Sequence, residues 1–491
     1  MVVNMGVLSG LEPQSVFYYF EEITKIPHGS GNVDRISDYL VEFARERNLF
    51  CIQDEVKNVI IVKEATPGYE NEPAVILQGH MDMVAVKKPD CTIDMKKEGL
   101  KVAIDGDKIY AEGTSLGGDD GIAVAYALAI LDSDSIKHPR LEVVITVDEE
   151  VGMDGARAID LSMLKGKRLL NLDSEEEGIF LTSCAGGARV KCQFPLQREQ
   201  VEGIAYEVTV GGLLGGHSGA EIHKERGNSN CLFGRLLWAL AEQVPVRLVS
   251  VNGGLADNAI PRETKAVIML DTADEKAYAG KVEAIVNKVS AEIKEELATK
   301  DPDFCVNMKA YGTGSYDCVT ADATRRAAAF LCALPNGVQA MSADMPGLVE
   351  TSLNMGILES EEESLLAEFS VRSSVESAKH GLIAKLRAIS ELAGGKAETF
   401  GDYPGWKYRV NSPLRDKMIA LYEKMYGETP KVEAIHAGLE CGLLGSKIED
   451  LDCVSFGPQM CDIHTTEETL SISSAARVWE YLVKLLEEKE M

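Results

Sequence analysis

The chain has 491 residues, of which 45% are hydrophobic and 26% charged, and its formal net charge is −28. This length predicts two or more domains with sizeable cores. The negative charge argues against nucleic acid or an anionic membrane as a partner. No run of about 18 apolar residues, as a membrane-spanning helix needs, occurs in the sequence.

The N-terminal segment and the cysteines predict a cytoplasmic protein. Residues 1–10 contain no basic stretch followed by a long apolar core, so no export signal is expected. The 11 cysteines are odd in number, scattered and never spaced as Cys-x-x-Cys. This usage is typical of reduced thiols rather than of a disulfide framework or a cysteine-rich zinc site.

The first part of the chain predicts helices over about 12–48, followed by strands at about 50–64 and 74–80. The second strand is a short apolar run of the kind found in buried parallel strands. It stops at His80 and Asp82, whose side chains leave the same side of an extended chain. That suits a metal ligand and a carboxylate that orients it, although a strand followed by a polar loop is the simpler alternative.

A glycine-rich loop at 113–121 leads into an almost wholly apolar segment at 122–131, which predicts a buried helix. Such a loop could cradle phosphate, but it has no lysine, so it is not a P-loop. Asp119 is the better candidate for bridging metal ions, because the glycines let the backbone approach a crowded centre. Asp120 could instead cap the helix.

Two further apolar runs end in carboxylates. Residues 141–147 lead into Glu149 and Glu150, and residues 168–172 lead into Asp173. In open α/β sheets ligands bind outside the carboxyl ends of the strands, so we expect these side chains at one rim, with those that follow the earlier strand. So many carboxylates repel one another unless a cation is present.

The character of the sequence changes near residue 200. The segment from there to about 400 alternates strands and amphipathic helices, and catalytic-looking features return only near the C-terminus, where His464 follows another strand. We therefore predict a catalytic domain formed by 1–202 and 399–491, interrupted by an inserted domain at 203–398. The predicted fold class is α/β, a mixed sheet flanked by helices, with an α+β insertion.

Five ordered motifs along essentially the whole chain resemble those of the M20 family of dinuclear-zinc peptidases. Within that family they are most similar to the aminoacyl-histidine dipeptidase group. The motifs lie at residues 79–82, 117–121, 148–156, 171–174 and 463–468.

The resemblance implies two divalent metal ions per chain. The expected metal is Zn²⁺, with Co²⁺ or Mn²⁺ as substitutes. His80 and Asp173 would bind one ion, Glu150 and His464 the other, and Asp119 would bridge them. Histidine nitrogens and carboxylate oxygens are a ligand set that zinc accepts.

The resemblance also implies the roles of two residues beside the ligands. Asp82 would hydrogen-bond the far ring nitrogen of His80 and fix its tautomer. Glu149 would act as the general base, because it neighbours a ligand yet is free to take a proton from water.

The inserted domain resembles the lid of this family. In dimeric members, a histidine and an asparagine reach each site from the partner's lid, and an arginine of the same chain grips the substrate carboxylate. His217 and Asn258 match the first two, and Arg372 in a later, similar passage matches the third. We therefore expect a duplicated lid, at about 205–295 and 303–398. One chain could then supply the whole set, even if it forms a homodimer.

For His217 and Arg372 there are simpler alternatives, a loop histidine and a surface ion-pair partner. The implied function is metal-dependent hydrolysis of dipeptides of the Xaa-His type, including β-alanyl-histidine-like ones, with broad specificity and a small peptide as the only partner. One alternative is an N-acyl amino acid deacylase with the same metal centre. The other is a non-catalytic metal-binding protein, against which Glu149 and Asp82 argue, because a binding module needs no free base.

Overall fold

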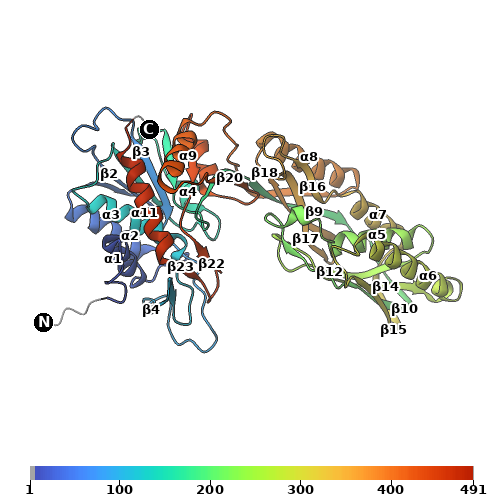
Figure 1. The fold of residues 1–491 in the computed structure, drawn as a ribbon. Helices are drawn as coiled ribbons and strands as arrows, with labels where there is room; N and C mark the ends of the chain where they lie inside the picture. The colour runs from blue at the N-terminus through green and yellow to red at the C-terminus, as the bar shows by residue number, and fades with distance from the viewer. Residues whose placement is uncertain (1–5, 490–491) are drawn as a thin grey trace. The chain divides into compact units, whose positions relative to one another are not determined.

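The computed structural model describes residues 6–489, which form two compact units (Figure 1). The first unit comprises the chain up to Ser183 together with 406–434 and 439–491, and the second comprises 184–405 and 435–438. The second unit is thus longer at both ends than the predicted insertion of 203–398. It includes β9 (Gly186–Pro195) and β19 (Lys396–Tyr403), which pair with each other, and β9 also pairs with β18 (Ser364–Ser373).

The first unit contains a mixed eight-stranded sheet, which confirms the predicted α/β class. Its central strands β6, β3, β7 and β21 run parallel, and the strands at its margins are antiparallel. Every residue of β3 and β6 is buried, in keeping with their apolar sequences. In sheet order the strands are β1 (Phe50–Gln53), β2 (Val59–Lys63), β6 (Leu141–Thr146), β3 (Val75–His80), β7 (Arg168–Asn171), β21 (Asp452–Ser455), β8 (Ile179–Cys184) and β20 (Lys431–Ile435).

Helices of the first unit come from both ends of the sequence. The apolar helix predicted after the glycine-rich loop is α3, which is buried from Gly118 to Leu131 and packs against α1 and β3. A small sheet in the order β22-β23-β5-β4 joins the C-terminal part of the chain to the N-terminal part. The remaining bounds are α1 (Gln14–Thr24), α2 (Asp34–Glu46), α3 (Gly118–Asp132), α4 (Asp154–Ala158), α9 (Pro413–Tyr426), α10 (Glu440–Lys447), α11 (Ile472–Glu487), β4 (Val102–Asp105), β5 (Lys108–Ala111), β22 (Met460–Cys461) and β23 (Thr469–Ser471).

The second unit is built on a nine-stranded antiparallel sheet, and its helices pack on the sheet to form one apolar core. A separate ribbon of β11 (Gly216–His217) and β13 (Ala259–Ile260) lies outside this sheet. The other elements are β10 (Arg198–Gly211), η1 (Ile222–Lys224), α5 (Ser229–Ala241), β12 (Arg247–Gly253), β14 (Thr264–Asp271), α6 (Thr272–Glu296), β15 (Cys305–Val319), α7 (Ala321–Ala333), β16 (Gly337–Met341), β17 (Val349–Ser360) and α8 (Glu376–Leu392).

The strand order of this sheet repeats outward from the contact between β12 and β17. One side runs β12-β14-β10-β15 and the other β17-β18-β9-β19. Along the chain, the first set reads β10, α5, β12, β14, α6, β15, and the second reads β9, α7, β17, β18, α8, β19. The two sets therefore share a βαββαβ order, but they are not the contiguous halves 205–295 and 303–398, because β9 precedes the first set and β15 pairs with β10.

Candidate metal centre

The polar residues predicted at strand ends lie at one rim of the sheet in the first unit. The parallel register pairs His80 of β3 with Thr146 of β6, and Gln78 of β3 with Asn171 of β7. The carboxyl ends of the three strands are therefore level, and the carboxylates that follow β6 and β7 start from the same edge as His80.

Five of the predicted residues form two groups that share one aspartate. The ligand atoms of His80, Asp119 and Asp173 lie within 4.8 Å of one another, and so do those of Asp119, Glu150 and His464. His80 Nε2 is 3.2 Å from Asp119 Oδ1 and 3.6 Å from Asp173 Oδ1. His464 Nε2 is 3.2 Å from Asp119 Oδ2 and 2.9 Å from Glu150 Oε1. Each carboxylate oxygen of Asp119 thus faces a different histidine.

These residues fit a pair of divalent ions. The Oε1 atom of Glu150 is buried and accepts no hydrogen bond from the described residues, although His464 Nε2 is 2.9 Å away. An orphaned buried oxygen is costly in a protein, whereas donor atoms that converge on a shared cation have their lone pairs satisfied. Each group offers one imidazole nitrogen and two carboxylates, a set suited to zinc and related metals.

The electrostatics of the two groups also demand positive charge. Burial favours a neutral ring, yet the carboxylates of Asp119, Asp173 and Asp82 raise the pKa of His80 well above its ordinary value. The neighbouring carboxylates, Asp119 first, raise the pKa of His464 to about 10. The histidines would hold protons to offset the carboxylates, and a divalent ion in each group removes that need.

Asp82 links the orientation of His80 to the position of Glu149. His80 Nδ1 lies 3.0 Å from the main-chain oxygen of Asp82 and 3.4 Å from its Oδ1, so the shorter contact is to the main chain rather than to the predicted carboxylate. The carboxylate itself accepts hydrogen bonds from Ser30 Oγ at 2.8 Å and from the main-chain nitrogen of Glu149 at 3.1 Å. Ser30 was not found from the sequence, because its contact with Asp82 depends on tertiary structure.

Glu149 stands beside both groups and belongs to neither. Burial raises the pKa of its carboxyl well above the ordinary value, and the carboxylates of Asp173 and Glu440 add to this, although His80 opposes it. A carboxylate with a raised pKa that is not itself a ligand is suited to accept a proton and return it.

Asp120 does not cap α3, so that alternative is wrong. Its Oδ2 instead accepts a hydrogen bond from the main-chain nitrogen of His80 at 3.1 Å. Its other oxygen, Oδ1, accepts no hydrogen bond from the described residues, and the main chain is not helical at Asp119 and Asp120, where α3 is kinked. Asp120 therefore fixes the end of β3, where the sequence pattern had suggested only a helix terminus.

Glu440 is a further buried carboxyl group beneath this rim that sequence reasoning missed. It accepts hydrogen bonds from Gln78 Nε2 at 2.5 Å and from Thr146 Oγ1 at 2.6 Å. Gln78 Oε1 in turn accepts one from Asn171 Nδ2 at 2.6 Å. Burial raises the pKa of Glu440 to about 8. One side chain thus ties together β3 and β6, the strands that carry His80 and lead to Glu149.

The predicted substrate-binding residues lie together in the second unit. The register of β11 and β13 pairs His217 with Ala259, and Ser218 N donates to the main-chain oxygen of Asn258 at 2.8 Å. A Cβ atom added to Gly219 would lie 3.1 Å from both His217 Cε1 and Arg372 Nε. One chain therefore brings His217, Asn258 and Arg372 to the same region.

Arg372 is not a surface ion-pair partner. Its side chain is only 8% exposed, and its Nε finds no hydrogen-bond acceptor among the described residues. Nη1 donates to the Tyr403 hydroxyl at 3.3 Å, and no carboxylate of the described chain forms an ion pair with the guanidinium. A buried cation without an anion is costly, so this site favours a negatively charged ligand.

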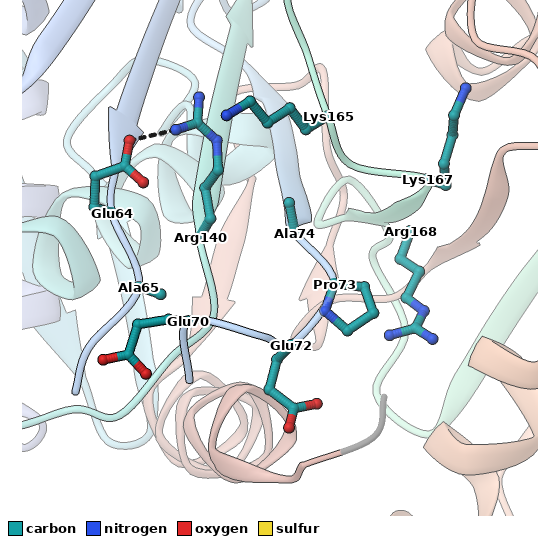
Figure 2. A pocket seen from close by; sticks show the side chains of 10 residues that line it. All are labelled: Glu64, Ala65, Glu70, Glu72, Pro73, Ala74, Arg140, Lys165, Lys167 and Arg168. Carbon is teal, nitrogen blue, oxygen red and sulfur yellow. Dashed lines mark hydrogen bonds and ion pairs between the residues drawn. The ribbon is translucent and has the colours of Figure 1, made fainter. Parts of the chain in front are cut away.

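A cavity of about 490 Å³ lies at the other end of the parallel strands, and Figure 2 shows the residues that line it. Ala74 and Arg168, at the beginnings of β3 and β7, line it, and Arg140 in its wall pairs with Glu64. Its four basic residues are nearly balanced by three acidic ones, and none of the predicted site residues lines it. This cavity therefore lies apart from the metal centre.

Two histidine–carboxylate groups that share an aspartate, beside a carboxylate that belongs to neither, are the arrangement expected of a metal-dependent hydrolase. Residues 76–488 match the model of Peptidase family M20/M25/M40, and the chain belongs to this family. It is a peptidase.

Two relatives match this chain over nearly their whole length at more than a third identical residues. The cytosol non-specific dipeptidase of Escherichia coli strain K12 is 38% identical over 486 residues, which are 99% of both chains. The crystal structure of aminoacylhistidine dipeptidase from Vibrio alginolyticus has a TM-score of 0.91 at 37% identity and covers 100% of both chains. Aminopeptidase PepT from Bacillus cereus, at 15% identity and a TM-score of 0.55, shares the fold, with 97% of this chain and 98% of its own covered. Within residues 6–489, no helix has the length and apolarity needed to cross a membrane.

Proposed function

We propose that this M20 peptidase hydrolyses dipeptides, Xaa-His dipeptides among them, with two zinc ions held by the shared-aspartate centre. The observation that carries the proposal is the position of Asp119, whose two carboxylate oxygens each lie 3.2 Å from a different histidine nitrogen. The names of the two full-length relatives support dipeptides as the substrate class. These names favour a dipeptidase over an N-acyl amino acid deacylase with the same metal centre.

In this proposal His80 and Asp173 would hold one ion, Glu150 and His464 would hold the other, and Asp119 would be common to both. When bound, the ions would polarise the scissile carbonyl and lower the pKa of the attacking water towards about 7. Co²⁺ or Mn²⁺ could take the place of Zn²⁺, since the same ligand types bind them.

The protein's own groups move the proton. Glu149 takes it from the attacking water and delivers it to the amine of the leaving amino acid, so the carboxylate ends the cycle unchanged. Asp82 supports this step by holding the main chain of Glu149 and the ring of His80. His217 of the second unit would donate to the oxyanion that develops on the scissile carbonyl.

Substrate length would be set by Arg372 and Asn258. The buried guanidinium of Arg372 has no anionic partner among the described residues, and the free C-terminal carboxylate of a dipeptide supplies one. In a dipeptide one residue separates the C-terminal carboxylate from the scissile bond. A clamp on this carboxylate limits good substrates to dipeptides and similarly short molecules.

We further propose that the lid, the second unit, arose by duplication and completes the site within one chain. The repeated βαββαβ order supports this, because it is found once on each side of the contact between β12 and β17. His217 lies on β11 and Asn258 directly precedes β13, both between elements of the first set, and Arg372 lies on β18 of the second set. A homodimer would then not be needed to assemble these residues.

The proposed location is the cytoplasm, which the name of the Escherichia coli relative supports. The proposed partner is the small peptide substrate, whether or not two chains form a homodimer.

A panel assay tests the substrate class. The purified protein is supplied with Zn²⁺ and offered Xaa-His dipeptides, other dipeptides, tripeptides and N-acetyl amino acids. We expect rapid cleavage of dipeptides with a free C-terminal carboxylate and slow cleavage of the other two classes. Faster turnover of N-acetyl amino acids than of any dipeptide would overturn the proposal.

A further inference from the structure

The carboxylate of Glu468 lies in a cradle of four consecutive main-chain N–H groups. Glu468 is only 3% exposed. Its Oε2 accepts hydrogen bonds from the nitrogens of Leu116 and Gly117 at 2.8 and 3.1 Å. Its Oε1 accepts them from Gly118 and Asp119 at 2.8 and 3.4 Å. The cradle therefore ends at the residue that faces both histidines of the metal centre.

The glycines of this loop make the cradle possible. Gly117 has φ +67°, in the left-handed region that glycine adopts most readily. A Cβ atom on Gly118 would lie 3.3 Å from Glu468 Oε1 and 3.2 Å from Met460 Sδ. Consecutive N–H groups in such a turn form an anion-binding concavity. The loop has the geometry that suggested a phosphate site, but Glu468 of the same chain is its anion.

Glu468 joins two segments that are distant in sequence. It follows His464 by four residues and directly precedes β23, which pairs with β5 of the N-terminal part. His464 and Asp119, whose side chains are 3.2 Å apart, are separated by 345 positions along the chain. The hydrogen bonds that the loop donates to Glu468 therefore connect the segment of Asp119 with the segment of His464, two of the three segments that supply the group of Asp119, Glu150 and His464.

The negative charge of Glu468 is held by the main chain alone. No lysine, arginine or histidine of the described residues forms an ion pair with this carboxylate. Burial raises the pKa of the Glu468 carboxyl, and the hydrogen bonds from the loop N–H groups oppose this rise. Hydrogen bonds to an ionised acceptor are about twice as strong as neutral ones. Four of them on one loop give Glu468 direct control over where the main chain of Asp119 lies.

We propose that Glu468 is a positioning residue of the peptidase, which holds the Leu116–Asp119 main chain so that Asp119 can serve both ligand groups. This rests on the proposed metal centre. Because Asp119 is common to both groups, loosening its main chain should weaken the binding of both ions together. The catalytic rate should fall while KM changes little, since Glu468 is not proposed to touch the substrate.

The test uses the full-length protein with the substitution Glu468→Gln, which keeps the shape but turns one acceptor oxygen into a donor. The matched control is Glu467→Gln, because Glu467 is the neighbouring residue, 67% exposed, and pairs with Lys88 instead of the loop. Loss of a group that supports metal ligands typically costs about 10–100-fold in metal affinity or activity. We expect a loss of that size in the affinity for both ions and in kcat for Glu468→Gln, and none for Glu467→Gln.

Metal affinity is measured by competition with a chelator, with Tm recorded for each metal-free variant. If Glu468→Gln bound both ions with the affinity of the unaltered protein, the proposed role of Glu468 would be overturned. Weaker binding of only one of the two ions would overturn it as well. Absence of metal binding in the unaltered protein would instead contradict the proposed function.

A second measurement on the unaltered protein covers the case in which Glu468→Gln does not fold. Because Glu468 holds the loop without help from the ions, the amides of residues 116–119 should resist hydrogen exchange in the metal-free protein. Rapid exchange of these amides before metal is added, and protection afterwards, would show that the ions and not Glu468 order the loop, and would overturn the proposal.

Discussion

The candidate metal centre of the first unit and the surroundings of Arg372 in the second unit carry opposite charges, and each lacks a counter-charge among the described residues. The first gathers carboxylates that raise the pKa of His80 and His464, and so requires cations. The second buries the guanidinium of Arg372 without a carboxylate partner among the described residues, and so requires an anion. In both regions the unsatisfied charge is the basis for the proposed ligand, metal ions in one and a substrate carboxylate in the other.

The largest effect is expected from Asp119→Ala. Because each of its carboxylate oxygens faces a different ligand group, removing the side chain should abolish the binding of both ions and all detectable turnover. Elemental analysis of the dialysed variant, with a dipeptide assay on the same sample, measures both. If the variant retained two tightly bound ions, Asp119 would not be a shared ligand of the two groups in the first unit.

Glu149→Ala should lose turnover while keeping both ions. Glu149 lies outside both ligand groups, so metal content should match that of the unaltered protein. Loss of a general base typically lowers the rate by about 10²–10⁴-fold. Near-normal kcat in the metal-loaded variant would show that another group moves the proton.

Arg372→Ala tests whether the guanidinium of the second unit binds the substrate carboxylate. A hydrogen bond to a charged group contributes about 1.5–3 kcal/mol, so KM for a good dipeptide should rise by roughly 10–150-fold. The same dipeptide with an amidated C-terminus should be a poor substrate for the unaltered protein, and the variant should discriminate little between acid and amide. Equal KM values for the acid and the amide in the unaltered protein would contradict the proposal that Arg372 binds the substrate carboxylate.

Smaller effects are expected beneath the metal centre at Glu440. Glu440→Ala leaves Gln78 Nε2 and Thr146 Oγ1 without their buried acceptor, at a cost of about 1–3 kcal/mol for each group in the free energy of unfolding. Glu440→Gln keeps an acceptor oxygen in place and should cost less. Urea unfolding of the two variants in parallel checks the order, and equal losses would mean that the hydrogen bonds contribute little.

No effect at all is expected from mixing two inactive variants, His217→Ala and Glu149→Ala. If each chain completes its own site, co-refolding equal amounts restores nothing. If a partner chain supplied His217, random two-fold dimers would recover about a quarter of the unaltered rate. Such recovery would show that His217 of one chain completes the site that contains Glu149 of the other chain.

The sequence predicted the metal centre better than the architecture around it. Each candidate ligand stands next to an apolar strand or a glycine-rich loop, so local patterns and motif order were enough to find His80, Asp119 and Asp173. Ser30 and Glu440 were missed because their contacts join segments far apart in the chain.

The start of the second unit was placed too late for a similar reason. β9 looks continuous with the first part of the chain, and only its pairing with the distant β18 assigns it to the second sheet. For Asp120 the sequence left a helix cap as one alternative, because the local pattern could not show the main-chain nitrogen of His80 beside it.

The most direct test of the central claim is a metal titration of the metal-free protein, in which bound Zn²⁺ and the rate of Xaa-His dipeptide hydrolysis are recorded on the same samples. The account predicts two ions per chain at saturation and no turnover without metal. Full activity in the presence of an excess of chelator, or saturation at fewer than two ions per chain, would contradict it.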